Sequence, residues 1–276
     1  PRVRVAGPRG PPAQAGGHAV SALLRMEFAK LGRLSSVRFG MLVLVAFPWL
    51  WAYAPGVFDV YGFFIVSGFQ VPALSLLSSM AFLLPLLVAI AAAELLGVEI
   101  QHGTLPTVLL RPVTRSQWLL AKLLVVSVLP FLGLAWFLLA SLLAGAAFGF
   151  GGFVGGTGLG ADGLLGAGWL APAQAWTEVL RAYFVAAYAL LPIALLAVLF
   201  AVLFMNAAAG ALATMATLIV MELLVVFPGV TPYLLTTQLS AYVSPPADLG
   251  WVVALIAFYC AAFAAVAVIV FERKDF

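Results

Sequence analysis

Six long apolar stretches constrain the fold of this chain more than any other feature of its sequence. A transmembrane helix needs roughly 20 mostly apolar residues to cross a hydrocarbon core about 30 Å thick. Hydrophobic residues make up 65% of the 276 residues and charged residues only 8%, which is far from the composition of a soluble domain. The sequence therefore predicts an all-α, polytopic membrane protein with six transmembrane helices. We expect these helices at residues 39–58, 72–96, 118–148, 179–205, 207–227 and 249–271.

The region before the first predicted span divides into two parts. Residues 1–19 are rich in proline and glycine and have almost nothing to bury, so we expect a disordered tail. Further on, Leu24, Phe28 and Leu31 recur at helical spacing, with charged residues at other positions. This pattern predicts an amphipathic helix at the membrane interface, with a cytoplasmic extension of the first span as the alternative. We expect residues 20–276 to form a single transmembrane domain.

Two alternatives concern how the chain begins. It starts with proline rather than methionine, which makes Met26 an alternative first residue. A basic leader, an apolar run and the triplet Ala52-Tyr53-Ala54 also resemble a cleavable signal peptide. We favour a transmembrane helix, because the charged leader is long and the apolar run continues past the triplet.

Proline and glycine positions predict how the spans are interrupted and joined. Pro85 lies within the second span and predicts a kink there. Residues 145–168 are glycine-rich and predict a flexible loop between the third and fourth spans. Asn206 and Gly210 lie between the fourth and fifth spans and predict a tight helical hairpin.

Basic residues are distributed very unequally between the two sides of this six-span topology. Of the thirteen lysine and arginine residues, only Arg181 falls on the side opposite to the two termini. Loops that carry lysine and arginine tend to stay in the cytoplasm. We therefore predict that both termini and the segment 94–122 are cytoplasmic.

The sequence offers few residues for catalysis or cofactor binding. It lacks the P-loop pattern and the H-E-x-x-H and G-x-S-x-G motifs. Its only histidines are His18 and His102, and its single cysteine, Cys260, lies in an apolar run. Glycines 158, 160 and 163 match G-x-G-x-x-G, but no strand precedes them, so we interpret the match as chance. We expect no catalytic site, no metal or other cofactor, and no nucleic-acid partner.

Three carboxylates lie in or near the predicted spans. An ionisable residue inside a bilayer is costly and is a functional hypothesis by default. Glu94 lies near the cytoplasmic interface, where solvation explains it, and Glu178 can pair with Arg181 three residues further on. Glu222 lies deeper in its span. For Glu222, a pathway-lining or helix-pairing role and an interfacial role both remain open.

The segment 94–122 combines charge with turn residues between two apolar spans. Gly103 permits a backbone turn, and Thr104 can cap a short helix that begins near Leu105. Pro112 ends that helix. The pattern predicts a short amphipathic helix at the membrane surface, suited to transmit force from a docked cytoplasmic partner.

The residues of this segment resemble the signature of type-2 ABC-transporter permeases, the ABC-2 family. The family patterns are E-x-x-x-G-T-L, then L-L-x-x-P-[VI]-[ST]-R, then a G-K pair. Two positions differ, since Pro106 stands where the family often has glutamate and Ala121 stands in place of the last glycine. The ending with Phe271, Arg273 and Asp275 also resembles the family. The matching residues are Glu99, Gly103-Thr104-Leu105, Leu109-Leu110, Arg111-Pro112-Val113-Thr114-Arg115 and Lys122.

The resemblance implies a permease subunit that couples ATP hydrolysis by a separate subunit to substrate movement, usually export. Such a subunit dimerises with itself or with a related permease, binds two copies of an ABC ATP-binding subunit and does not hydrolyse ATP itself. The implied location is the inner, cytoplasmic membrane of a prokaryote, with several passes. The implied coupling residues are Glu99, Gly103, Thr104, Leu105, Leu109, Arg111, Pro112 and Arg115.

Two other functions remain as alternatives. One is an accessory membrane subunit of an ABC complex that serves envelope or metalloprotein assembly. The other is a stand-alone secondary transporter. That class normally has internal repeats and more charged residues at mid-membrane, and this sequence has neither.

Overall fold

The computed structural model describes residues 24–54, 65–101, 115–155, 159–160, 163–164, 166–244 and 248–274. Within these residues, five helices are each long and apolar enough to cross a membrane, and the number is six if a bent helix pair counts as one span. The prediction of an all-α, polytopic membrane protein is therefore confirmed. Residues 24–31 form a first helix. The other helices are α2 (Ser35–Tyr53), α4 (Gln70–Met80), α5 (Leu83–Gln101), α7 (Arg115–Gly145), α8 (Pro172–Phe204), α9 (Ala207–Leu223), α10 (Leu235–Gln238) and α11 (Leu249–Glu272).

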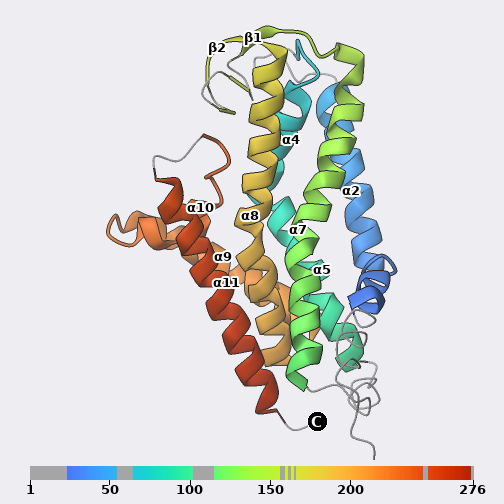
Figure 1. Ribbon diagram of the computed structural model, residues 1–276, viewed down its shortest axis with the longest axis vertical. Coiled ribbons are helices and arrows are strands. Elements are labelled where there is room, and N and C mark those ends of the chain that lie inside the picture. Colours follow the sequence, from blue (N-terminus) through green and yellow to red (C-terminus); the bar gives the residue numbers. More distant parts are fainter. Residues whose placement is uncertain are drawn as a thin grey trace, which may run out of the picture.

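Helix α8 is the centre of the bundle. It packs against α5, α7, α9 and α11, and Figure 1 shows it standing between α7 and α11. In its most apolar stretch of 18 residues, 72% of the residues are buried, whereas the corresponding share for α2 is 17%. Small residues such as Ala182, Ala186 and Ala189 are fully buried along it and allow the neighbouring helices to approach closely. Helices α2, α9 and α11 therefore lie at the outside of the bundle, with most of their residues outside the core of this chain.

The second predicted span is broken into α4 and α5, which meet at an angle of 66°. Pro85 lies in the first turn of α5. Proline has no backbone N–H, and its ring clashes with the carbonyl four residues earlier, at Ala81. Ala81 and Phe82 form the turn between the two helices. The expected interruption is present, but it is a sharp break rather than a gentle kink.

The end of the bundle with the glycine-rich connection is more ordered than the sequence predicts. Strands β1 (Phe153–Gly155) and β2 (Gly168–Leu170) pair antiparallel at the top of Figure 1. Gly68, just before α4, donates to the Gly149 carbonyl at 2.7 Å. A Cβ added at Gly68 would lie 2.4 Å from the Gly145 carbonyl oxygen, so no larger residue fits this approach. The connection is therefore packed onto the bundle.

The hairpin between α8 and α9 agrees with the prediction. Met205 adopts a left-handed conformation with φ of 53° and ends α8. Asn206 then caps α9, because its side-chain oxygen accepts a hydrogen bond from the Ala209 N–H at 3.1 Å. Gly210 lies so close to Ala201 that an added Cβ would be 2.7 Å from the Ala201 nitrogen.

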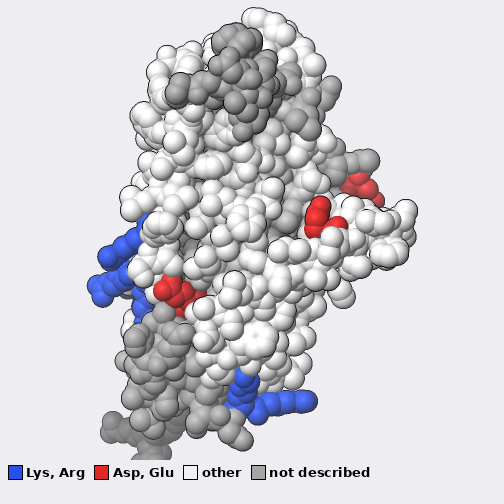
Figure 2. Space-filling model, turned by 180° about the vertical axis from the view of Figure 1, so that it is seen from behind, with Lys and Arg blue, Asp and Glu red and all other residues white. Residues whose placement is uncertain are grey.

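The opposite end of the bundle, which we call the basic end, holds most of the lysine and arginine side chains. Figure 2 shows these side chains in the lower half of one face and none in its upper part. The helix at residues 24–31 ends at Leu31, where a turn separates it from α2. The basic residues that the structure describes at this end are Arg25, Lys30, Arg33, Arg38, Lys122, Arg273 and Lys274.

Candidate functional site

Four charged side chains from three separate parts of the chain meet at the basic end, and we call them the ion network. Lys122 Nζ lies 2.8 Å from Glu27 Oε2 and 3.2 Å from Glu99 Oε1. Lys30 Nζ lies 3.0 Å from Glu27 Oε1 and also contacts Glu99 Oε1. Each lysine thus bridges both carboxylates. The network joins the helix at residues 24–31 to the end of α5 and the beginning of α7.

The network is deeply buried at its centre. The side chains of Lys122 and Glu27 are each 1% exposed, that of Glu99 is 10% exposed and that of Lys30 is 40% exposed. Lys122 Nζ also donates to the Leu95 carbonyl of α5 at 2.8 Å. Charges in such surroundings are costly unless they are paired and hydrogen-bonded. The mutual pairing satisfies this condition.

Aromatic rings close the network on the side of α11. The Lys122 ammonium lies 4.9 Å from the centre of the Trp118 ring, which is a cation–π distance. Trp118 in turn stacks on Phe271, the penultimate residue of α11, with ring centres 5.2 Å apart. Both rings are buried. The C-terminal helix is therefore coupled to the network through apolar packing.

The charge state of Lys30 depends on its two carboxylate partners. Burial by itself lowers the pKa of this ammonium group. Hydrogen bonds and charges from Glu99 and Glu27 act in the opposite direction and hold the pKa of Lys30 above its ordinary value of 10.5. Lys30 is therefore charged at neutral pH, as the pairing requires.

A separate polar contact lies one turn along α5 from the network. Ser36 Oγ, in the first turn of α2, donates a hydrogen bond to Glu94 Oε2 of α5. Glu94 is half-buried. The contact ties α2 to α5, so the solvation that the sequence suggested for Glu94 is accompanied by a specific partner.

The structure places only part of the predicted coupling segment. Glu99 lies in α5 and belongs to the ion network. Arg115 is the first residue of α7, and its side chain lies outside the described residues. The other predicted coupling residues, together with His102, also lie outside the described residues: Gly103, Thr104, Leu105, Leu109, Arg111 and Pro112.

Sequence reasoning did not assign Glu27, Lys30 or Lys122 to the site. The two N-terminal residues were expected on the polar side of an interfacial helix, but Glu27 is fully buried. The pair is spaced three residues apart, which places both side chains on one helix face. The sequence signal that could have indicated the network was this spacing. A glutamate before the α5–α7 connection and a lysine after it were the other part of that signal.

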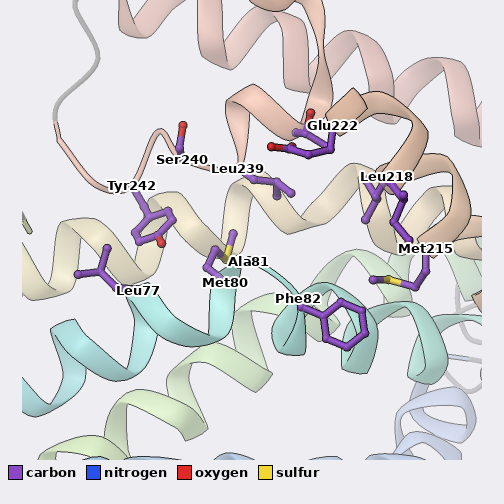
Figure 3. Close-up of a pocket in the computed structure, with 12 residues that line it drawn as sticks. Leu77, Met80, Ala81, Phe82, Met215, Leu218, Glu222, Leu239, Ser240 and Tyr242 are labelled. Atoms are coloured by element: carbon purple, nitrogen blue, oxygen red, sulfur yellow. The ribbon is translucent and has the colours of Figure 1, made fainter. Parts of the chain in front are cut away.

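Glu222 lies elsewhere, in a pocket of about 420 Å³ beside the α4–α5 break. Figure 3 shows Glu222 and Leu218 of α9 on one side of this pocket and Met80, Ala81 and Phe82 on the opposite side. Glu222 itself is exposed. The remaining lining residues come from α4, α9 and the α10 region: Leu77, Met215, Ile219, Thr236, Leu239, Ser240 and Tyr242.

The pocket combines apolar walls with a few polar atoms. Thr236 Oγ1 is buried and has no hydrogen-bond partner among the described residues. Burial raises the pKa of the Tyr242 phenol to about 12, so the group stays neutral. A concave, mostly apolar site with few convergent polar groups is the usual form of a small-molecule pocket.

Comparison with known proteins agrees with the fold and with the sequence signature. The chain matches the family model described as "ABC-2 family transporter protein" over residues 23–201. A search of curated proteins gave no significant match. The matched range includes all four members of the ion network and ends before α9, which carries Glu222. Because this range covers well over half of the chain, the protein belongs to the ABC-2 family, the membrane permeases of ABC transporters.

Proposed function

We propose that this chain is the transmembrane subunit of an ATP-driven exporter, and that its ion network links a docked ATP-binding subunit to the helical bundle. One observation carries the proposal. Glu99, two residues before the end of α5, and Lys122, the eighth residue of α7, lie on the two helices that flank the α5–α7 connection, and both belong to the same buried network as Glu27. The segment between them, residues 102–114, contains most of the predicted coupling residues. A displacement of that segment would therefore move α5, α7 and the N-terminal helix together.

The partners follow from the same proposal. Two copies of an ATP-binding subunit dock at the basic end, and a second permease, identical or related, completes the transporter. The basic end is then cytoplasmic, because lysine and arginine accumulate on that side of a membrane. ATP shifts the permease between two arrangements to the extent that the docked subunits bind one of them more tightly.

The pocket beside the α4–α5 break is the proposed part of the export pathway in this chain. Interrupted helices are tolerated at membrane depth where they line a cavity, and transporters use such breaks at their binding sites. Glu222 supplies the only acidic side chain among the lining residues. A role of Glu222 in the pathway explains an ionisable group on a helix that is otherwise apolar.

The docking proposal can be tested with an ABC ATP-binding subunit from the same genome that co-purifies with this chain. The two proteins are co-expressed, the complex is purified, and its ATPase rate is measured for Glu99→Gln, Arg115→Gln and the unchanged chain. We expect both variants to weaken co-purification or to change the ATPase rate. Glu178→Gln is the matched control, because Glu178 forms a part-buried ion pair away from the basic end. If both variants co-purify normally and show an unchanged ATPase rate, the docking proposal is wrong.

The pathway proposal needs a separate experiment, because it can fail independently. In a Cys260→Ala background, the chain has no other cysteine, so Ser240→Cys introduces one thiol at the pocket. We expect ATP with vanadate to change the rate of maleimide labelling at this position at least severalfold. Val154→Cys, on the exposed side of β1, should label at the same rate in both conditions. Equal rates with and without nucleotide at position 240 would contradict a moving pathway there.

A further inference from the structure

A second cavity, of about 240 Å³, lies between α2, α5 and α7 and is distinct from the Glu222 pocket. Its walls are almost entirely apolar. Along α2, Ser36, Gly40 and Leu44 line it over two helical turns, a length of about 12 Å. Phe28, in the helix before α2, lies at one end of this groove. For comparison, an apolar cavity of about 150 Å³ binds benzene.

Two hydrogen bonds join the helices that form the walls of this groove. Trp136 Nε1 of α7 donates to the Met41 carbonyl of α2 at 3.2 Å. On the other side, Ser36 Oγ donates to Glu94 of α5. Met41 and Ser36 both line the groove. The three helices are therefore fixed around the groove rather than separated by a gap that side chains could close.

Glycine keeps the groove open on α7. A Cβ added at Gly133 would have no atom within 4 Å, although Gly133 lies in a helix and lines the groove. Glycine inside a helix costs stability relative to alanine, and close helix packing is the usual reason for it. Close packing does not apply here, so empty space for another molecule accounts for this glycine.

The end of the groove at Gly32 is positively charged. Arg38 Nε donates to the Gly32 carbonyl at 3.2 Å, which holds the guanidinium group beside a lining residue. Arg33 is the next residue along and is exposed, as is Arg38. Glu94 and Glu27, two carboxylates at this end of the bundle, have other partners: Ser36 for Glu94, and the two lysines of the ion network for Glu27.

We propose that this groove binds one acyl chain of an anionic phospholipid, whose phosphate is held by Arg38 and Arg33. An apolar groove with Arg38 bound to the Gly32 carbonyl at its edge, and with Arg33 next in sequence to Gly32, complements a hydrocarbon chain attached to a negative headgroup. Arginine is well suited to phosphate, because its planar fork of donors matches the oxygens. The proposal does not depend on the docked ATP-binding subunit or on the Glu222 pocket.

The test measures lipid retention by native mass spectrometry of the full chain after reconstitution in vesicles of equal parts phosphatidylglycerol and phosphatidylcholine. We expect one retained phosphatidylglycerol per chain, favoured over phosphatidylcholine by about tenfold. Gly133→Leu fills the groove and should lower this retention by about tenfold. Ala135→Leu adds the same side chain to an exposed position of α7 outside the groove and should change nothing.

The variant Arg38→Gln tests the contribution of the lipid headgroup separately from that of the acyl chain. It should reduce the preference for phosphatidylglycerol by about fivefold while phosphatidylcholine is still retained. If Gly133→Leu does not fold, Gly40→Leu narrows the groove from α2 instead, where an added Cβ meets only Leu87 at ordinary contact distance.

Three outcomes would overturn the proposal. One is equal retention of the two lipids by the unchanged chain. Another is full retention in both groove-filling variants, and this would mean that the lipid lies elsewhere. The third is a change of oligomer mass in Gly133→Leu with unchanged lipid, because the groove would then be occupied by a second copy of this chain.

Discussion

Two regions of this molecule carry acidic side chains among apolar helices, and they are built in opposite ways. In the ion network, Glu27 and Glu99 share two lysines and lie almost wholly out of contact with solvent. In the pocket beside the α4–α5 break, Glu222 is exposed, and none of the residues that line the pocket is a lysine or an arginine. The carboxylates of the first region are paired with lysines of the same region, whereas the pocket holds a carboxylate with no lysine or arginine among the lining residues.

The difference teaches which of the two regions can change without loss of the fold. A buried charge costs several kcal/mol unless its partner stays in place, so the network must remain paired while the helices move. An exposed carboxylate carries no such penalty and can gain or lose a partner. The network is therefore suited to hold three helices as one body, and the pocket is suited to bind and release.

The largest effect is expected from breaking the network. Lys122→Met removes the buried cation that pairs with both Glu27 and Glu99, and leaves Lys30 paired with them. The free energy of unfolding should fall by about 3–5 kcal/mol, the usual cost of removing one partner of a buried ion pair. Thermal or urea unfolding of the detergent-solubilised protein measures this. Arg25→Met removes a charge from an exposed position at the same end and should have little effect.

A double variant distinguishes lost pairing from lost packing. Glu27→Gln combined with Lys122→Met removes one charge of each sign and leaves Lys30 with Glu99. If the two charges interact, the combined loss should be smaller than the sum of the single losses by about 0.5–3 kcal/mol. Strictly additive losses would show that the ion pair has no energetic role, and the contrast with the pocket would disappear.

The next effect concerns the contact between α5 and α9, the helices that carry Glu99 and Glu222. A Cβ at Gly97 would lie 2.4 Å from Ala207 Cβ and 2.7 Å from the Ala207 nitrogen. Gly97→Ala should therefore destabilise the protein by about 1–3 kcal/mol. Gly133→Ala, which meets nothing within 4 Å, should instead stabilise it by about 0.5–1 kcal/mol. The same unfolding experiment compares both, and a loss in both would contradict the close approach at Gly97.

Glu222→Gln is expected to leave stability almost unchanged, within about 0.5 kcal/mol. The reason is that Glu222 is exposed and no described residue forms an ion pair with it. The unfolding midpoints of Glu222→Gln and Lys122→Met, measured in the same experiment, compare the pocket with the ion network directly. A loss as large as that of Lys122→Met would assign Glu222 a helix-pairing role and remove it from the pathway.

The smallest effect is the pH dependence of the network. The pKa of Lys30 in the folded protein lies above its ordinary value of 10.5. The stabilisation that Lys30 provides is therefore complete below that value and is lost as the pH rises through the folded-state pKa. Unfolding midpoints should be flat from neutral pH to about 10 and fall above it, and they should fall less in Lys30→Arg, because arginine keeps its charge. A fall already near neutral pH would rule out Lys30 as its source.

Much of the fold could be predicted because it depends on local patterns. Length and apolarity alone define the transmembrane helices, since each must cross the same thickness of hydrocarbon. Asn206 and Gly210, between two apolar runs, predicted the α8–α9 hairpin, and the structure adds that Asn206 caps α9. Pro85 predicted an interruption of the second span, although not its 66° angle, which depends on how α4 and α5 pack against their neighbours. The order of the glycine-rich connection also depends on packing, as at Gly68.

The sequence by itself determined that this is a multi-pass ABC-2 permease. The reason is that the apolar spans and the Glu99 to Lys122 signature both depend on residues that are close together in the sequence. It did not determine the ion network. Glu27 and Lys122 are 95 positions apart, and no periodicity reports that their side chains meet at 2.8 Å. Only the tertiary structure decided which charges are buried, because burial is a property of the packed helices. The same packing decided which cavities between the helices stay open.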